Sequence, residues 1–96
     1  MKIKRMHRDK LPIFVREPIR ELRENINNGN PRVFNNDEGR LPNAHGNTYY
    51  EYDVGEARDG SRGRHRIVAL VSDGDKLEAL YYSNDHYGVE WTEITW

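Results

Sequence analysis

A chain of 96 residues is long enough for one small domain with a modest hydrophobic core. The absence of cysteine excludes disulfides, thiolate metal sites and a cysteine nucleophile. No apolar stretch approaches the roughly 18 residues of a membrane-spanning helix, so we expect no membrane partner. The net charge of −1 hides an uneven distribution, because residues 58–66 contain four arginines against one acidic residue. This local cluster permits a nucleic-acid partner but does not require one.

The N-terminal third is expected to form an arm and then one helix. Residues 1–12 show no clean period, and we interpret them as a loose N-terminal arm that precedes a single domain over residues 13–96. Pro18 suits the first turn of a helix, where its missing N–H is tolerated. Apolar side chains recur at helical spacing from there, at Ile19, Leu22 and Ile26. A glycine and a proline soon afterwards mark the end, so a helix is predicted over residues 17–27.

After the helix, the pattern changes to short strands separated by turns. A strand over residues 32–34 is followed by a loop over 35–47 that is rich in asparagine, glycine and proline. Four further strands are predicted, over residues 49–54, 66–72, 77–82 and 88–95. In the first of these, Glu51 lies on the opposite face from Tyr50 and Tyr52, because side chains alternate along a strand. The expected fold is α+β, with one N-terminal helical segment packed on an antiparallel sheet of about five strands.

A carboxylate, two arginines and a histidine occupy positions where this sheet could bring them together. Glu51 lies mid-strand among tyrosines, where glutamate is a poor choice for packing. Arg62 and Arg66 lie where the next strand begins, and His86 lies in the turn between the last two strands. Taken singly, each has a simpler interpretation as a surface carboxylate, a cross-strand ion pair or a surface histidine. Together they can converge on one face of the sheet.

Metal-independent cleavage of RNA needs such a set of side chains. A base must take the proton of the 2′-hydroxyl as it attacks phosphorus, and an acid must protonate the departing 5′-oxygen. Arginines stabilise the negative charge that the phosphorane gains. Because the attacking group is the 2′-hydroxyl, RNA is a substrate and DNA is not. We expect no metal and no cofactor, since the histidines and acidic residues show no ligand spacing.

Four motifs occur in order along the last two-thirds of the chain. They are Phe34–Gly39 followed by Leu41-Pro42, Tyr49–Tyr52, Arg62–Ile67 and Tyr81–Tyr87. On these motifs the chain resembles the microbial guanyl-specific ribonucleases, the family of barnase and its actinobacterial extracellular relatives. The resemblance implies that Glu51 is the general base and His86 the general acid. It also implies that Arg62 and Arg66 bind the phosphate.

The resemblance further implies a guanine pocket in the loop after the first strand. Glu38 would accept hydrogen bonds from the ring N–H and exocyclic amine of guanine, and Phe34 would lie at the base pocket. Three residues would direct backbone N–H groups toward guanine O6: Asn35, Asn36 and Asp37. Asn36 suits such a loop because asparagine tolerates a left-handed conformation, whereas Asp37 stands where relatives commonly carry arginine. Tyr87 would lie beside the scissile phosphate.

These observations predict a guanyl-preferring endoribonuclease that cleaves single-stranded RNA to a 2′,3′-cyclic phosphate and then hydrolyses it to a 3′-phosphate. The alternative is a non-catalytic RNA-binding module on the same fold, although the pair of Glu51 and His86 favours catalysis. Because this activity would be toxic inside the producing cell, we expect secretion or delivery as a toxin domain. We also expect a monomer and a proteinaceous inhibitor or immunity protein, whose acidic surface would complement the arginine cluster.

Overall fold

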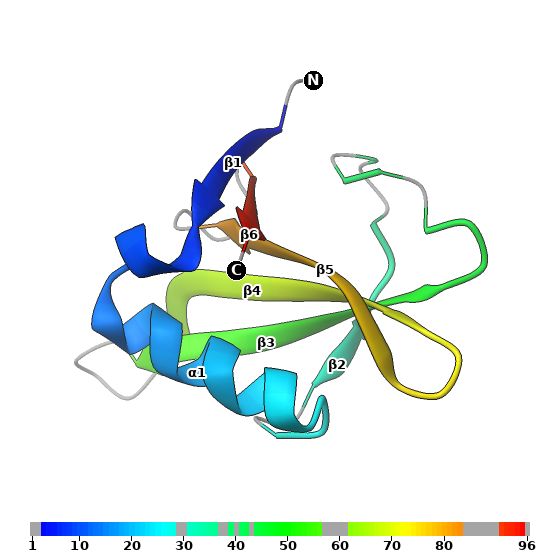
Figure 1. Cartoon of the computed structure of the whole chain (residues 1–96), viewed down its shortest axis with the longest axis horizontal. Coiled ribbons are helices and arrows are strands. Elements are labelled where there is room, and N and C mark those ends of the chain that lie inside the picture. Colours follow the sequence, from blue (N-terminus) through cyan, green and yellow to red (C-terminus); the bar gives the residue numbers. More distant parts are fainter. Residues whose placement is uncertain are drawn as a thin grey trace.

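The computed structural model describes residues 3–28, 31–36, 39, 41–42, 44–56, 62–83 and 91–95. For residues 53–56 and 62–65 it describes the backbone alone. Along the chain, the described elements are β1 (Lys4–His7), the 3-10 helix η1 (Arg8–Lys10), α1 (Ile13–Glu24), β2 (Arg32–Phe34), β3 (Thr48–Glu56), β4 (Arg62–Ser72), β5 (Lys76–Ser83) and β6 (Thr92–Thr95) (Figure 1).

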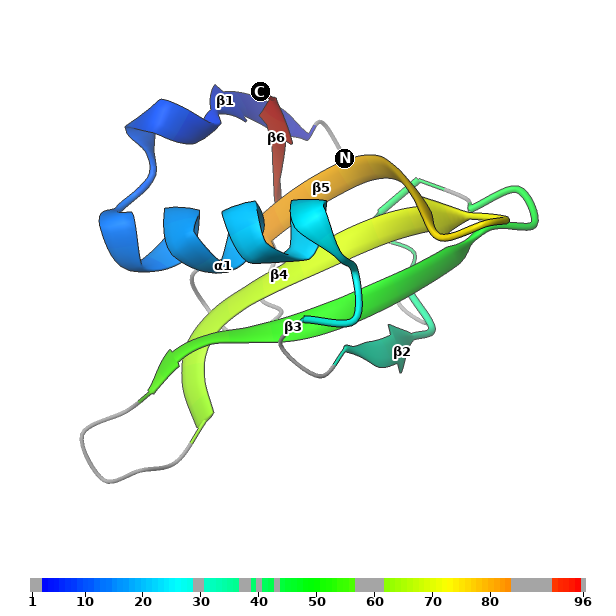
Figure 2. The same cartoon turned by 60° about the horizontal axis from the view of Figure 1, so that its bottom comes forward.

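The strands form one sheet in the order β1-β6-β5-β4-β3-β2, and α1 packs across one of its faces (Figures 1 and 2). Neighbouring strands from β6 to β2 run antiparallel, whereas β1 and β6 run parallel. The prediction of an α+β fold with one helix on a sheet is confirmed. The sheet differs from the expectation, because the described residues form six strands rather than about five and the sheet is mixed rather than antiparallel.

The extra strand is β1, so the prediction of a loose arm over residues 1–12 is wrong for the described part of that segment. Lys4–His7 pairs with Thr92–Thr95, and Met6 packs against the core on the helix side of the sheet. Four residues are too few to show a strand period. The pairing partner lies 88 residues away in sequence, so no local pattern could indicate it.

Helix α1 covers Ile13–Glu24 instead of the predicted 17–27, so it both begins and ends earlier. Pro18 therefore lies inside the helix, where its missing N–H removes one backbone hydrogen bond. The helix tolerates this loss because it buries one face against the sheet, through Val15, Ile19 and Leu22. Asn25 has extended backbone dihedrals and ends the helix.

The two faces of the sheet carry different sets of side chains. The face under α1 carries the larger buried cluster, which includes Tyr52, Ile67, Ala69, Leu80 and Ile94. The other face, which we call the open face, carries a smaller cluster of Leu41, Tyr49, Val68, Tyr81 and Trp91. The alternation predicted for β3 is confirmed, because Tyr52 packs toward the helix and Tyr49 toward the open face. Glu51 shares the open face with Tyr49.

Candidate active site

Glu51 and Arg66 lie on the open face of two neighbouring strands. In the register of β3 and β4, Glu51 is opposite Val68, and Asp53 is opposite Arg66. Arg66 is therefore the diagonal neighbour of Glu51, a relation that places the two side chains about 7–8 Å apart at their base. Both side chains are long enough to meet across that spacing. The structure thus brings together two of the residues that the sequence indicates for the chemistry.

The carboxylate of Glu51 is held by an arginine from the strand on its other side. Arg32 on β2 is the direct register partner of Glu51, and its Nε donates to Glu51 Oε1 at 3.1 Å. The side chain of Glu51 is 16% exposed and that of Arg32 is 45% exposed. Glu51 is therefore anchored by the sheet but still reachable from solvent, which a proton acceptor for a substrate hydroxyl requires.

Arg66 is the largest fully buried side chain among the described residues, with a relative exposure of 0%. It lies on the central strand β4, opposite Ser83 of β5, which is also buried. Its neighbours enclose the Arg66 side chain, and close packing restricts the directions in which the guanidinium group can point. A fixed guanidinium group suits stabilisation of a phosphorane, because it needs no reorganisation during the reaction.

Beside these two residues, four aromatic rings pack together on the open face and form what we call the aromatic floor: Phe34, Tyr49, Tyr81 and Trp91. Phe34 makes edge-on contacts with Tyr49 and Trp91, with ring centroids 6.4 and 5.9 Å apart. Tyr49 in turn contacts Tyr81 at 6.2 Å. Trp91 is only 4% exposed, so it packs within this cluster rather than offering a platform for base stacking.

The tyrosines of this floor stay protonated at neutral pH. Burial, together with the charge and hydroxyl of Tyr81, raises the pKa of Tyr49 far above the ordinary tyrosine value. Burial and the nearby Glu93 raise the pKa of Tyr81 as well. Neither phenol can act as a general base under physiological conditions. The carboxylate of Glu51, diagonal to Arg66, is instead the candidate proton acceptor.

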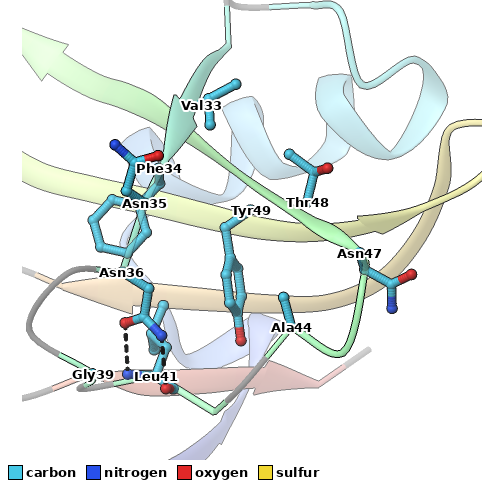
Figure 3. Close-up of a pocket in the computed structure, with 10 residues that line it drawn as sticks. All are labelled: Val33, Phe34, Asn35, Asn36, Gly39, Leu41, Ala44, Asn47, Thr48 and Tyr49. Carbon is cyan, nitrogen blue, oxygen red and sulfur yellow. Dashed lines mark hydrogen bonds between the residues drawn. The ribbon is translucent and has the colours of Figure 1, made fainter.

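Next to the floor lies an open pocket of about 680 Å³ between β2, β3 and the loop that follows β2 (Figure 3). Its volume falls in the range of about 300–1,000 Å³ that is typical of small-molecule sites. Its lining includes three of the residues expected to recognise guanine: Phe34, Asn35 and Asn36. The pocket also includes Tyr49, so the aromatic floor and the loop meet in one cavity.

The loop beside the pocket is clamped by Asn36. The Asn36 side chain donates to the carbonyl of Leu41 at 2.9 Å and accepts the Leu41 N–H at 3.2 Å (Figure 3). Its backbone has a φ of 55°, the left-handed conformation that the sequence analysis allowed for asparagine. Tyr49 adds a second clamp, because its hydroxyl donates to the carbonyl of Pro42 at 2.7 Å. The Asn36 side chain therefore shapes the loop.

The remaining residues expected at the site are placed only in part. Arg62 is the first residue of β4, where its register partner is Glu56, and its side chain lies outside the described part of the chain. The other four expected residues lie outside the described residues altogether: Asp37, Glu38, His86 and Tyr87. No group of three histidine or acidic side chains that could hold a metal occurs among the described residues. None of the helices in the described part of the chain is long and apolar enough to cross a membrane.

Sequence reasoning missed Arg32. Its position in a three-residue strand gives no period, and an arginine before a valine looks like an ordinary edge residue. The available signal was the register: if Phe34 lies opposite Tyr49 at the pocket, then the residue two positions earlier lies opposite Glu51.

A carboxylate and a buried arginine on one sheet face, beside a pocket of this kind, are groups that cleavage of RNA can use. In agreement, a sequence profile described as ribonuclease matches residues 5–92. The chain belongs to this family, the microbial guanyl-specific ribonucleases, and is an endoribonuclease.

Among solved structures, ribonuclease Sa2 in complexes with mononucleotides is similar to this chain. The two share 29% sequence identity with a TM-score of 0.76, over 99% of this chain and 96% of that chain. A search of curated protein sequences gave no significant match. The resemblance inferred from the four motifs is therefore confirmed.

Proposed function

We propose that this protein cleaves single-stranded RNA on the 3′ side of guanosine, without a metal, through a 2′,3′-cyclic phosphate that it then hydrolyses to a 3′-phosphate. The proposal rests on one observation. Glu51, a carboxylate that is anchored but reachable from solvent, lies on the same sheet face as the buried Arg66 and is its diagonal neighbour. Family membership and the similar structure with bound mononucleotides support it.

In the first step Glu51 takes the proton of the 2′-hydroxyl, and the 2′-oxygen bonds to phosphorus. His86 gives a proton to the 5′-oxygen as its bond to phosphorus breaks, so the overall charge is conserved. Arg66 and Arg62 stabilise the negative charge on the phosphorane. In the second step the groups exchange roles: His86 takes a proton from water as the water oxygen bonds to phosphorus, and Glu51 gives a proton to the 2′-oxygen as its bond to phosphorus breaks. Tyr87 lies beside the phosphate in this scheme.

Guanine preference belongs to the loop after β2. Phe34 supplies an aromatic ring at the pocket, and backbone N–H groups of Asn35, Asn36 and Asp37 bind guanine O6 in this scheme. Glu38 accepts from the ring N–H and the exocyclic amine. A site that hydrogen-bonds a base disfavours analogues that leave its buried polar groups unpaired, so adenosine at the same position is expected to be a poor substrate.

The test is cleavage of GpU in the presence of EDTA, with ApU as the competing substrate. Guanosine 2′,3′-cyclic phosphate should form first and guanosine 3′-phosphate later, with GpU strongly preferred. Activity that returns only on adding a divalent metal would refute the mechanism. Tight RNA binding with no cyclic product would favour the non-catalytic RNA-binding module instead.

The acid and base are tested with matched controls. Glu51→Ala and His86→Ala should each lower kcat by at least about a hundredfold, the scale of acid–base groups. Glu93 is a suitable control for Glu51, because it too is a carboxylate paired with an arginine through its Oε1. His7, an exposed histidine on β1, is the control for His86. Glu93→Ala and His7→Ala should retain kcat.

Such an enzyme is expected to act outside the producing cell, by secretion or as a delivered toxin domain, with an acidic inhibitor that covers the arginine cluster of residues 58–66. It is expected to be a monomer. The test is growth of a bacterial host that expresses the wild type or Glu51→Ala without an inhibitor. Growth arrest by the wild type alone supports the need for export and inhibition, and equal growth would contradict it. Sedimentation analysis checks the monomer.

A further inference from the structure

We propose that Arg32 is a positioning residue of the active site, which aims Glu51 at the substrate. The inference rests on the proposed function, because it assigns Arg32 a role through the general base. Arg32 lies directly opposite Glu51 in the register of β2 and β3. Its Nε donates to Oε1 of Glu51 at 3.1 Å, so the two side chains meet on the open face.

The contact restricts a flexible side chain. A glutamate has three rotatable side-chain bonds, and on a flat sheet face its carboxylate can point in several directions. An arginine is well suited to remove that freedom, because its guanidinium group is planar and its donors have fixed directions. With Oε1 held by Arg32, the carboxylate keeps one orientation on the sheet face. A misplacement of about 1 Å can cost a hundredfold in rate, so this restraint matters for turnover.

The short strand β2 also ties the carboxylate to the base pocket. Arg32 and Phe34 are two residues apart on one strand, so their side chains leave the same face. Phe34 lies in the pocket, whereas Arg32 contacts Glu51. Two residues along a strand span about 6.6 Å. This distance sets a fixed offset between the base site and the general base. Arg32 therefore keeps Glu51 in register with the nucleotide that the pocket binds.

The same sheet contains a matched control for this role. One cross-strand row contains, in order, Arg5, Glu93, Tyr81, Val68, Glu51 and Arg32. Each end of the row thus carries an arginine that donates through Nε to Oε1 of the glutamate opposite, at 2.8 Å for Arg5 and 3.1 Å for Arg32. Only the Arg32 pair involves the proposed general base. Removing either arginine breaks the same kind of contact at an exposed edge of the sheet.

The experiment compares kcat and KM for GpU in Arg32→Ala, Arg32→Lys and Arg5→Ala, each alone and with Glu51→Ala. Arg32→Ala should lower kcat at least about tenfold and leave KM within about twofold, because aiming acts on the chemical step. Arg32→Lys keeps a charged donor and should recover part of that loss. Arg5→Ala should retain wild-type values. In the Glu51→Ala background, Arg32→Ala should have no further effect, since its role acts through Glu51.

Two results would overturn the inference. One is a raised KM with unchanged kcat, which would make Arg32 a substrate-binding residue. The other is the same fold loss of kcat with and without Glu51, which would make its effect independent of the carboxylate. If Arg32→Ala does not fold, as judged by circular dichroism, Arg32→Gln takes its place in the same comparison. A wild type that forms no cyclic phosphate would instead refute the proposed function, and the inference with it.

Discussion

The sharpest prediction concerns Asn36, which clamps the loop after β2. Its side chain bonds the loop, and its backbone has a strained, left-handed conformation. Asn36→Ala removes two hydrogen bonds to Leu41. At about 0.5–1.5 kcal/mol each, their loss costs about 1–3 kcal/mol. It also places alanine at a φ of 55°, which costs a further about 1–2 kcal/mol. Asn36→Gly removes the hydrogen bonds but adopts the left-handed conformation freely.

The loop should therefore lose about 2–5 kcal/mol in Asn36→Ala and less in Asn36→Gly. Since 1.4 kcal/mol corresponds to a factor of ten, kcat/KM for GpU should fall at least about tenfold in Asn36→Ala, with Asn36→Gly between it and the wild type. Asn28→Ala is the control, because Asn28 also bonds a backbone carbonyl, that of Glu21, at the C-terminal end of α1. It should leave kcat/KM unchanged.

The assay is initial-rate cleavage of GpU, accompanied by thermal unfolding to confirm that each variant is folded. A glycine variant that is less active than the alanine variant would refute the argument from backbone strain. Wild-type activity in both variants would refute the clamp itself.

Three predictions concern stability. Burial raises the pKa of Tyr52 to about 12, above the value of about 10 in the unfolded chain, so the folded state holds this proton more tightly. The resulting stability is present below about pH 10 and is lost as pH rises toward 12. Tyr52→Phe should therefore flatten the decline of the urea midpoint between about pH 9 and pH 11. An unchanged slope of the midpoint against pH would contradict this. Leu80→Ala, at a fully buried position, should lower the free energy of unfolding in urea by about 2–5 kcal/mol. The control Val33→Ala, at an exposed position, should lower it by less than about 0.5 kcal/mol. Equal urea midpoints in the two variants would contradict the burial of Leu80. Deleting residues 1–7 removes β1 and the packing of Met6, so it should lower the unfolding free energy by about 1–3 kcal/mol, and an unchanged midpoint would mean that β1 adds nothing.

The central part of the fold could be predicted from sequence because its signals are local. Successive side chains of β3 point to opposite faces of the sheet, and Tyr49 and Tyr52 lie on the faces that this alternation assigns. The apolar run of β4 and the turn after it likewise define a hairpin with β5. Each of these patterns depends on residues within a few positions of one another.

The missed features depend on distant partners. Strand β1 is held by β6, at the other end of the chain, and nothing within four residues encodes that pairing. Helix α1 continues through Pro18 because Val15 is buried on the sheet, and burial outweighs the local penalty of proline. Arg32 belongs to the site only through its register with Glu51. Sequence could supply the chemistry of the site but not the neighbour that anchors its carboxylate.

The pairing of β1 with β6 also fixes where a cargo or carrier could be attached. Both terminal strands lie at one edge of the sheet and β2 lies at the other. With neighbouring strands about 4.8 Å apart, the five intervals of the sheet separate these edges by about 24 Å. The two ends of this strand pair nevertheless differ, because Ile3, just before β1, packs against the same open-face cluster as Phe34, whereas β6 ends at Thr95, beyond the contact of Trp91 with Phe34. A polypeptide fused before β1 would therefore join the domain beside this cluster, and one fused after β6 would join it farther along the strand pair.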